Sequence, residues 1–243
     1  MATTEPEADQ AAPEGRVSKR RRATRARLLE AAYDVMIEAG ADAAKIKDIT
    51  DRADVGFGTF YNYFQTKDEI ASQVLDCVTN DLARRNRIAT SKLKAQDFIA
   101  RVPVSMRIVM REATTAPMWR WWALRPDLLI DRIRRGFRRY ALEDIDEAIE
   151  GGVFHLDRGQ MDSTWTLAVW MLVGGIHDVV VGNRNSEWDI FVVEAIMRAM
   201  GAPLDVARRI SRTPLPKCPQ PEIDWTFSLD EQPAVMKSSH VSD

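Results

Sequence analysis

The sequence predicts an all-α protein, with an N-terminal unit of three helices followed by a larger helical domain. Apolar residues recur every three or four positions along most of the chain, which is the spacing of one helix face. Near the N-terminus, two short helical stretches are separated by a break of only about three residues. The pattern shows no convincing strand and no internal repeat. The 243 residues, 45% hydrophobic and 29% charged, are ordinary for a soluble globular protein that buries a core.

The N-terminus changes character at residue 16. Residues 1–15 are acidic, rich in Ala, Pro and Glu, and lack the features of a secretory signal, so we predict a disordered tail. The next stretch holds seven cations and no acidic residue: Arg16, Lys19, Arg20, Arg21, Arg22, Arg25 and Arg27. Such a run is typical of a solvated face or a flexible arm. It leads into a helix whose apolar face carries Leu28 and Val35 and which ends at Gly40.

Three further helical segments follow closely. A second short helix carries Ile46 and Ile49, and a third is predicted over residues 57–63. The break between them, residues 54–56, is short enough to be a tight turn. A longer fourth helix is predicted over residues 66–87. Two short helices joined by a tight turn and braced by a longer one make a helix-turn-helix, whose second helix enters the major groove of DNA.

One pattern runs across these segments: residues 46–69 read IKDITDRADVGFGTFYNYFQTKDE. This stretch resembles the DNA-binding signature of the TetR family of bacterial transcriptional regulators. The resemblance covers about fifty residues, from the first helix to the start of the fourth. The sequence departs from the family pattern at Asp54 (usually Gly), at Gly56 (usually a capping Ser) and at Ala44 and Lys45, where a Thr commonly caps the second helix. These departures affect particular cap-to-phosphate contacts rather than the fold.

The resemblance implies roles for individual side chains in the head. Thr59, Tyr61 and Lys67 match family positions that commonly contact backbone phosphates. Asn62 is suited to bidentate pairing with adenine. For Tyr63, ordinary half-buried packing remains the alternative. Cations of the N-terminal run would track phosphates or enter the adjacent minor groove. The predicted DNA-binding residues are Arg20, Arg22, Lys47, Phe57, Gly58, Thr59, Tyr61, Asn62, Tyr63 and Lys67.

The rest of the chain is helical in pattern. Helices are predicted over residues 94–113, 126–150, 162–181, 188–200 and 204–210, with a tryptophan-rich stretch at 118–122. Four prolines between residues 214 and 221 and the loss of periodicity predict an irregular C-terminal tail. The predicted organisation is a disordered tail over 1–15, a helix-turn-helix domain with a basic arm over 16–68, a helical ligand-binding and dimerisation domain over 69–212, and an irregular tail over 213–243.

A regulator of this type needs a pocket in the larger domain. Met and aromatic side chains at helical spacing suit a mostly apolar site, although they equally suit plain core. The predicted ligand-binding residues are Met106, Met110, Trp119, Trp122, Phe137, Tyr140, Trp170 and His177. Arg107 and Arg111 would either meet an acidic ligand or form salt bridges.

The helix over residues 162–181 is apolar nearly all round, and such a helix needs cover on every side. By the resemblance, the last two long helices of the family form a four-helix bundle across a dimer. Both arguments predict a two-fold interface built from residues 162–181 and 188–200. The predicted interface residues are Trp165, Leu172, Ile176, Val193, Ile196 and Met200. A symmetric dimer predicts a near-palindromic operator.

The combined prediction is a ligand-responsive, sequence-specific DNA-binding transcriptional regulator. Repression is the family default, with release from the operator by a small apolar or amphipathic molecule. Its partners would be double-stranded operator DNA, a small-molecule effector and a second copy of the chain, with no cofactor, metal or membrane. The alternative is a helix-turn-helix protein that organises DNA without a small-molecule ligand.

Other classes of protein are disfavoured. The three histidines have no metal-ligand spacing, and the sequence lacks GxSxG, P-loop and GxGxxG motifs, so an enzyme is not expected. Cys77 and Cys218 make neither a disulfide framework nor a zinc pattern, which favours a reducing cytoplasm. The most apolar window, residues 165–181, is interrupted by His177 and Asp178 and is short for a membrane span.

Overall fold

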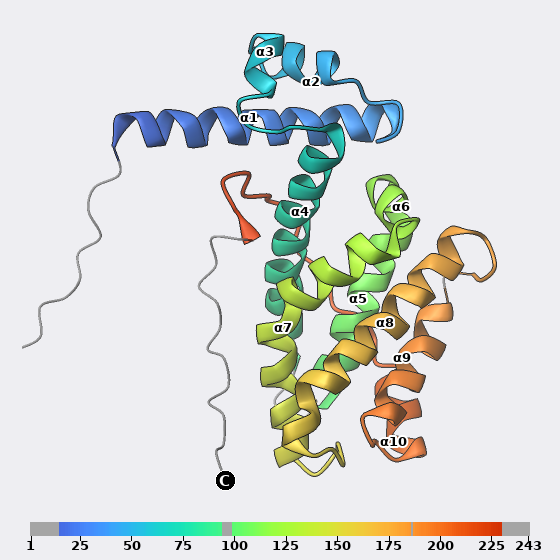
Figure 1. The fold of residues 1–243 in the computed structure, drawn as a ribbon. Helices are drawn as coiled ribbons and strands as arrows, with labels where there is room; N and C mark the ends of the chain where they lie inside the picture. Colours follow the sequence, from blue (N-terminus) through green and yellow to red (C-terminus); the bar gives the residue numbers. More distant parts are fainter. Residues whose placement is uncertain (1–14, 94–98, 186, 230–243) are drawn as a thin grey trace, which may run out of the picture.

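A computed structural model of the chain describes residues 15–93, 99–185 and 187–229. Within that part it contains ten α-helices and no strand, which confirms the predicted all-α fold. Figure 1 shows a small head lying across one end of a larger helical body. The outer parts of both predicted tails, residues 1–14 and 230–243, and the start of the helix predicted over residues 94–113 lie outside the described residues.

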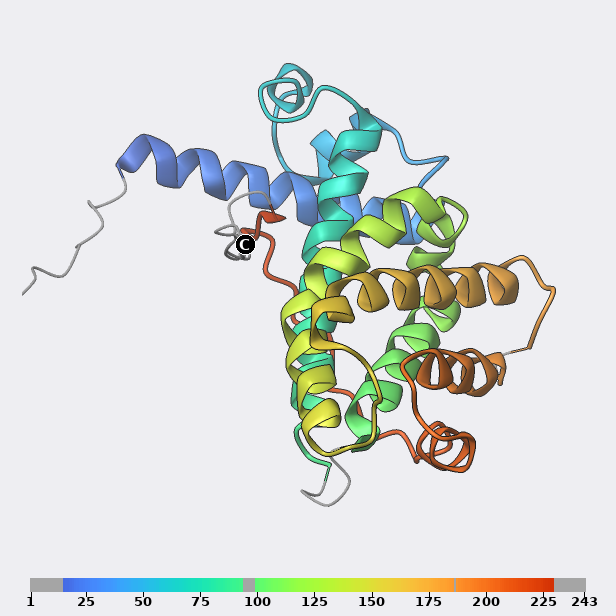
Figure 2. The ribbon, with the colours of Figure 1, turned by 60° about the horizontal axis from the view of Figure 1, so that its bottom comes forward.

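The head is built from α1 (Arg16–Ala39), α2 (Ile46–Arg52) and α3 (Phe57–Phe60). The basic run is the first part of α1 rather than a flexible arm, because arginine is a good helix former and residues 16–39 contain neither Gly nor Pro. α3 is shorter than predicted, since residues 61–63 form a turn. Figure 2 shows the N-terminal half of α1 projecting beyond the rest of the head.

The turn between α2 and α3 holds the one described non-glycine residue with positive φ, Asp54 at 52°. Aspartate tolerates this left-handed conformation, for which the family pattern has glycine. Beneath the turn, Phe60 and Phe64 are fully buried with their rings 5.7 Å apart. They share a core with Leu28 and Ile49, so one side of α3 is held inside the head while the other faces solvent.

α4 (Lys67–Thr90) starts in the head and continues into the body. The Thr66 hydroxyl accepts a hydrogen bond from the backbone N–H of Glu69 at 3.0 Å, which caps the helix at its predicted start. The helix extends past the predicted end at Arg87 to Thr90. One continuous helix therefore joins the two parts of the molecule.

The body consists of α5 (Arg101–Thr115), α6 (Pro117–Ala123), α7 (Pro126–Glu150), α8 (Met161–Val180), α9 (Trp188–Ala199) and α10 (Leu204–Ile210), with the 3-10 turn η2 (Arg158–Gln160) before α8. α7 packs along α4 and α8, while α5 packs against α4, α8 and α9. α10 packs on α9 at the end away from the head, and α6 lies beside the head in contact with α1 (Figure 1).

Two features fix α9 in the body. At Gly175 of α8, a Cβ atom would lie 2.7 Å from the Val192 Cγ2 of α9, so only glycine allows the two helices to approach this closely. Asp189 of α9, 1% exposed, accepts hydrogen bonds from Arg107 Nε at 3.0 Å and from Arg111 Nε at 2.9 Å. The two arginines considered for an acidic ligand are thus paired with a carboxylate of the protein itself.

After α10 the chain is irregular, as predicted, but residues 214–229 do not form a free tail. Figure 1 shows this segment, in red, returning beside α4 towards α1. Leu229 at its end is only 7% exposed. No helix of the described part is long and apolar enough to cross a bilayer.

Candidate functional site

The outward side of α3 presents aromatic side chains to solvent. Phe57 and Tyr61 are 53% and 50% exposed, and their rings meet edge-on at 5.7 Å. The Tyr61 ring also rests edge-on against the buried ring of Phe60 at 5.3 Å, which holds it in place. Gly58 beside them is exposed, and a Cβ there would meet no atom within 4 Å, so the backbone of α3 is accessible. Phe57, Gly58 and Tyr61, three of the predicted DNA-binding residues, are therefore accessible from solvent.

A groove of about 690 Å³ runs between the N-terminal half of α1 and the α3 turn. Thr59, Asn62 and Tyr63 line one wall, and Arg20, Arg21 and Arg27 line the other. The Arg21 guanidinium carbon lies 5.8 Å from the centre of the Tyr63 ring. Cations opposite hydroxyl and amide groups make this groove suited to a polyanion.

The structure changes the choice of arginines. Of the predicted pair, Arg20 lines the groove and Arg22 does not, whereas Arg21 and Arg27 line it and were left out of the prediction. For Arg21 the sequence contained the signal: stepping back from Leu28 by helical spacing gives residues 24, 21, 20 and 17, which share its face if the helix is continuous. Treating the run as a flexible arm hid that spacing.

The two predicted lysines have partners within the head. Lys47 pairs with Asp51 at 2.5 Å, although its side chain is 71% exposed. Lys67 donates a hydrogen bond from Nζ to the backbone carbonyl of Asp42 at 2.7 Å. An ammonium has three donors, so this contact leaves capacity for a phosphate.

Inside the body, a cavity of about 20 Å³ lies between α5, α7 and α8. Met106, Phe137 and Tyr140, three of the predicted ligand-binding residues, line it. Trp165 and Leu172, which were predicted for the dimer interface, line it as well. The volume suffices for about one water molecule, so an effector larger than water requires the walls to move.

The cavity has a polar end. Ser105 and Asp144 are part of its lining, and Arg87 bonds the Asp144 carboxylate at 2.7 Å while lying 5.6 Å from the Tyr140 ring centre. Burial raises the pKa of Asp144 above the usual range of an aspartate, against the opposing effect of the Arg87 charge. The lining of this cavity is therefore mostly apolar, with one acidic, hydrogen-bonding end.

The other predicted ligand residues are dispersed. Met110 is buried against Gly175, and Trp119 and Trp122 are buried with their rings edge-on at 5.6 Å. His177 is half-buried on α8 and lines none of the cavities described here. Trp170 is 57% exposed on the outer side of α8, which corrects its assignment to an internal pocket.

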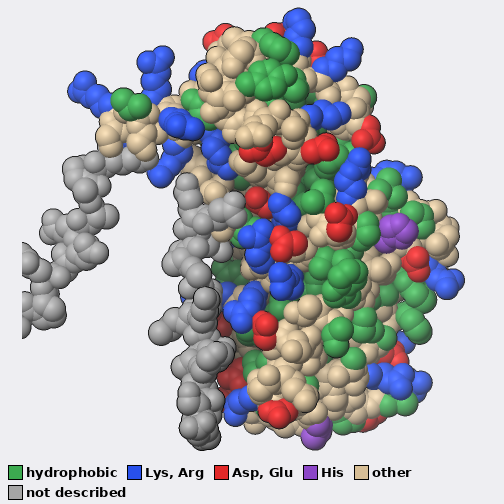
Figure 3. Space-filling model, viewed as in Figure 1, with side chains coloured by type: hydrophobic (Ala, Val, Ile, Leu, Met, Phe, Trp, Pro, Cys, Tyr) green, Lys and Arg blue, Asp and Glu red, His purple; other side chains and the backbone are tan. Residues whose placement is uncertain are grey.

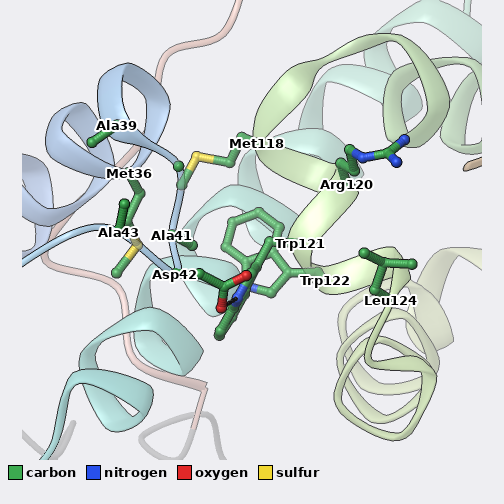
Figure 4. A pocket seen from close by; sticks show the side chains of 11 residues that line it. Met36, Ala39, Ala41, Asp42, Ala43, Met118, Arg120, Trp121, Trp122 and Leu124 are labelled. Carbon is green, nitrogen blue, oxygen red and sulfur yellow. Dashed lines mark hydrogen bonds between the residues drawn. The ribbon is translucent and has the colours of Figure 1, made fainter.

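A second, larger cavity of about 280 Å³ lies where the head meets α6 (Figure 4). Met36 of α1 and the α1–α2 loop face Met118, Trp121 and Trp122 across it. The Trp121 indole donates from Nε1 to the Asp42 carboxylate at 2.7 Å. That hydrogen bond lowers the pKa of Asp42.

Arg125 completes the contact between head and body. Its guanidinium lies 3.8 Å from the centre of the Trp121 ring and donates to Asp42 at 3.3 Å. The geometry couples the position of α6 to the loop between α1 and α2.

The predicted interface side chains prove to be core. All six are at most 3% exposed within a single chain: Trp165, Leu172, Ile176, Val193, Ile196 and Met200. All six belong to the hydrophobic core of the chain, and the Trp165 indole donates to the Arg134 carbonyl at 3.1 Å. A side chain already covered by its own chain has no surface left for a partner, so this residue choice is corrected.

The opposite side of the same helices is apolar and open. Its exposed hydrophobic residues are Leu167, Trp170, Met171, Val181 and Phe191. Figure 3 shows hydrophobic side chains over this part of the molecule. The Phe191 ring, 59% exposed, stacks on Trp188 at 4.4 Å. α8 is apolar nearly all round, as predicted, but the rest of the chain covers only one of its sides.

Among the described residues, no group of three or more His, Cys, Asp or Glu side chains is placed to hold a metal ion.

The sequence itself is similar to known regulators. Residues 28–74 match the model of the TetR family of bacterial regulatory proteins. The repressor DhaR of Mycobacterium sp. (strain GP1) is 38% identical over 60 residues, which are 25% of this chain and 30% of that protein. The repressor Rv3405c of Mycobacterium tuberculosis is 39% identical over 59 residues, 24% of this chain and 31% of that protein.

Residues 28–74 therefore form a DNA-binding domain of the TetR family. The matches to the curated relatives span only about a third of the length of those proteins. The family consists of regulators rather than enzymes, in agreement with the sequence-based expectation.

Solved TetR-type structures extend the likeness to the body. RolR in complex with resorcinol is 25% identical, with a TM-score of 0.71 over 83% of this chain and 99% of that one. FadR from Bacillus subtilis in complex with stearoyl-CoA is 14% identical, with a TM-score of 0.53 over 72% of this chain and 96% of that one. The second likeness shows the fold alone.

Proposed function

We propose that this TetR-family chain is a dimeric repressor that binds a near-palindromic operator and is released from it by a small effector. The observation that carries the proposal is the surface around α3. Phe57 and Tyr61 are exposed there, and Thr59 between them lines a groove together with Arg20 and Arg21. This combination offers base edges an aromatic contact and offers phosphates several cations and a hydroxyl.

The dimer would form through the outer face of α8 and α9. Leu167, Trp170 and Phe191 are each more than half exposed there, and monomeric proteins rarely leave such a set of large side chains to water. A second copy related by a two-fold axis would bury the face on both chains with the same residues. This interface would use the two helices expected from the sequence, but their outer side instead of the side that packs in the core.

The effector would bind in the cavity between α5, α7 and α8 and expand it. A small hydroxylated aromatic molecule suits the lining, with its ring against Met106 and Phe137 and a hydroxyl towards Asp144. RolR, whose fold this chain shares, has been solved in complex with resorcinol, a molecule of that kind. Expansion would displace α7 against α4, the helix that continues into the head. The two heads of the dimer would then lose the spacing of successive major grooves, and affinity would fall.

The operator is tested first, by selecting random duplexes with purified protein at physiological salt and sequencing them. We expect a near-palindromic motif. Tyr61→Ala and Arg20→Ala should weaken binding to it by about tenfold each, as expected for one phosphate or base contact. Arg139→Ala is the matched control, because Arg139 is 78% exposed on α7, outside the head, and should leave binding unchanged.

Recovery of no motif, with affinity that depends only on salt, would overturn sequence-specific regulation. It would favour the alternative of a DNA-organising protein.

The effector site is tested with resorcinol as the probe, by calorimetry on the free protein and by its effect on the operator complex. Ala141→Phe places a ring at the cavity wall and should abolish resorcinol binding. Ala199→Phe makes the same change at an exposed position of α9 and should not. Binding that survives Ala141→Phe would place the effector elsewhere, and operator affinity that resorcinol leaves unchanged would exclude phenols of this size as the effector.

A further inference from the structure

The segment that follows α10 is packed along two helices that belong to different parts of the molecule. Residues 214–229, here called the C-terminal strap, run beside α4 and end beneath α1 (Figures 1 and 2). The sequence predicts only an irregular tail here, because four prolines, Pro214, Pro216, Pro219 and Pro221, remove any helical or strand pattern. Proline restricts φ to extended values, so the same residues reduce the entropy that this segment loses when it is held in place.

On α4, the strap meets two buried charges. Asp81 and Arg85 are 2% and 3% exposed and pair at 2.6 Å. The backbone N–H of Glu222 donates to Asp81 at 3.2 Å, and Arg85 donates to the carbonyl of Pro219 at 3.2 Å. Buried charges are stable only when their hydrogen-bonding capacity is filled, and the strap backbone fills part of it. These contacts fix the strap to α4 in one register.

On α1, the strap makes an aromatic contact and a charged hydrogen bond. The Trp225 ring lies 5.1 Å from the Tyr33 ring at an angle of 52°. The carbonyl of Phe227 accepts a hydrogen bond from Arg25 at 3.4 Å and one from the Cys77 thiol of α4 at 3.6 Å. Arg25 also bonds Gln73 of α4 at 2.6 Å. One short stretch of strap therefore bridges α1 and α4 at the junction of head and body.

The bridge lies close to the groove that faces DNA. Arg25 is on the same helix as Arg20 and Arg21, one turn further along, so any rotation of α1 about this point moves the groove. The α6 contact through Asp42 and Trp121 supports the other end of α1. Contacts at two points, the strap and α6, fix the direction of α1, whereas a contact at one point would let the helix pivot.

We propose that the C-terminal strap is a positioning element for the DNA-binding head, with Trp225 as its principal positioning residue. The inference rests on the proposed function and adds to it the part of the chain that sets the angle between α1 and α4. When the strap is loosened, the head retains its own core and its DNA-facing side chains, but the two heads of a dimer no longer hold one separation. Affinity for the operator falls, and the preference for one half-site spacing broadens.

The test uses Trp225→Ala, Tyr33→Ala and the double variant in the full chain, with Trp225→Phe as the conservative variant. Hydrogen exchange of α1 is measured together with affinity for operators whose half-sites are moved apart by one or two base pairs. We expect faster exchange around Tyr33 in Trp225→Ala, operator binding weaker by about tenfold, as for the loss of one aromatic pair, and little effect of Trp225→Phe. The double variant should be no weaker than the stronger single variant, because both remove the same contact.

A chain that ends at Leu229 retains the whole strap and should behave as wild type. Unchanged exchange in α1 of Trp225→Ala would overturn the proposal whether or not DNA is bound. The proposal would also fail if the variants kept the wild-type preference for one half-site spacing and the double variant lost operator affinity additively. Both results would mean that Trp225 contributes only ordinary packing. Failure of the wild-type protein to select any operator would instead overturn the proposed function, and the exchange measurement would still decide whether the strap holds α1.

Discussion

Two surfaces of this molecule expose large aromatic side chains, and their neighbours differ. On the head, Phe57 and Tyr61 are about half exposed, and their chain neighbours Thr59 and Asn62 line a groove together with Arg20 and Arg21. On the body, Trp170 of α8 and Phe191 of α9 are exposed to a similar degree, and Leu167 and Met171 of α8 are exposed as well. Exposure alone therefore does not identify a partner. Cations and hydroxyls around an exposed ring suit a polyanion, whereas apolar neighbours suit a second protein surface.

The largest expected effect is a loss of stability when the ion pairs of Asp189, which hold α9 in the body, are removed. Asp189→Ala leaves Arg107 and Arg111 without their carboxylate inside the body. Unpaired buried charges of this kind cost about 3–5 kcal/mol, so the free energy of unfolding should fall by that amount in urea titrations. Asp205→Ala, at an exposed position in the first turn of α10, is the control and should change stability by less than about 0.5 kcal/mol. A loss at Asp189 no larger than in the control would mean that the pair does not hold α9.

The apolar surface itself is tested by placing charge on it. Trp170→Glu combined with Phe191→Glu should leave the subunit folded, because both side chains are exposed within one chain. The dimer should weaken by roughly 100-fold or more, since burying unpaired carboxylates costs about 3 kcal/mol. Sedimentation measures the change, and Leu204→Glu on α10, also at an exposed apolar position, should leave assembly intact. An unchanged dimer would remove this face from consideration as the interface.

On the head, a smaller change separates the Tyr61 hydroxyl from its ring. Tyr61→Phe retains the edge-on contacts with Phe57 and Phe60 and removes one hydrogen bond. Operator affinity should fall by about 1 kcal/mol, roughly fivefold, with no change in dimer assembly. Competition binding at fixed salt gives the value. If Tyr61→Phe binds the operator with wild-type affinity, the ring of Tyr61 and not its hydroxyl makes the contact with DNA.

The smallest expected effect is a pH dependence at the contact between head and α6. The Trp121 hydrogen bond lowers the pKa of Asp42 in the folded protein below its unfolded value. Its stabilising contribution is therefore complete above the unfolded pKa, about 3.9, and is lost as pH falls through the folded value. Trp121→Phe should lower the melting temperature slightly at pH 7, and the difference from wild type should shrink below about pH 4. A difference that stays constant with pH would mean that ring packing, not the carboxylate, makes the contact.

The head could be predicted from sequence because its structure is decided locally. The spacing of Ile46, Ile49 and Phe60 sets two helices, Asp54 takes the left-handed turn, and Thr66 caps the next helix through Glu69. Each of these depends on residues a few positions apart. The prediction for the head left out Arg21 and Arg27, which line the groove, because the helical run was taken for a flexible arm.

The body could be predicted only in outline. Periodicity gave the helices, but α8 is apolar on every side, so its sequence does not say which side packs against its own chain. Packing with α5, α7 and α9 buries Trp165 and Leu172 and leaves Trp170 outside. That choice depends on neighbours brought from distant parts of the chain.

By itself, the sequence determined the all-helical fold, the helix-turn-helix and the family, because helix periodicity, turn conformation and the residues facing DNA are properties of short stretches. The tertiary structure decided which face of α8 is open, how small the internal cavity is, and that residues 214–229 join head to body. Those features arise from contacts such as Tyr33 with Trp225, between residues far apart in the chain. Local sequence carries no record of such a contact, because either side chain alone suits many surroundings.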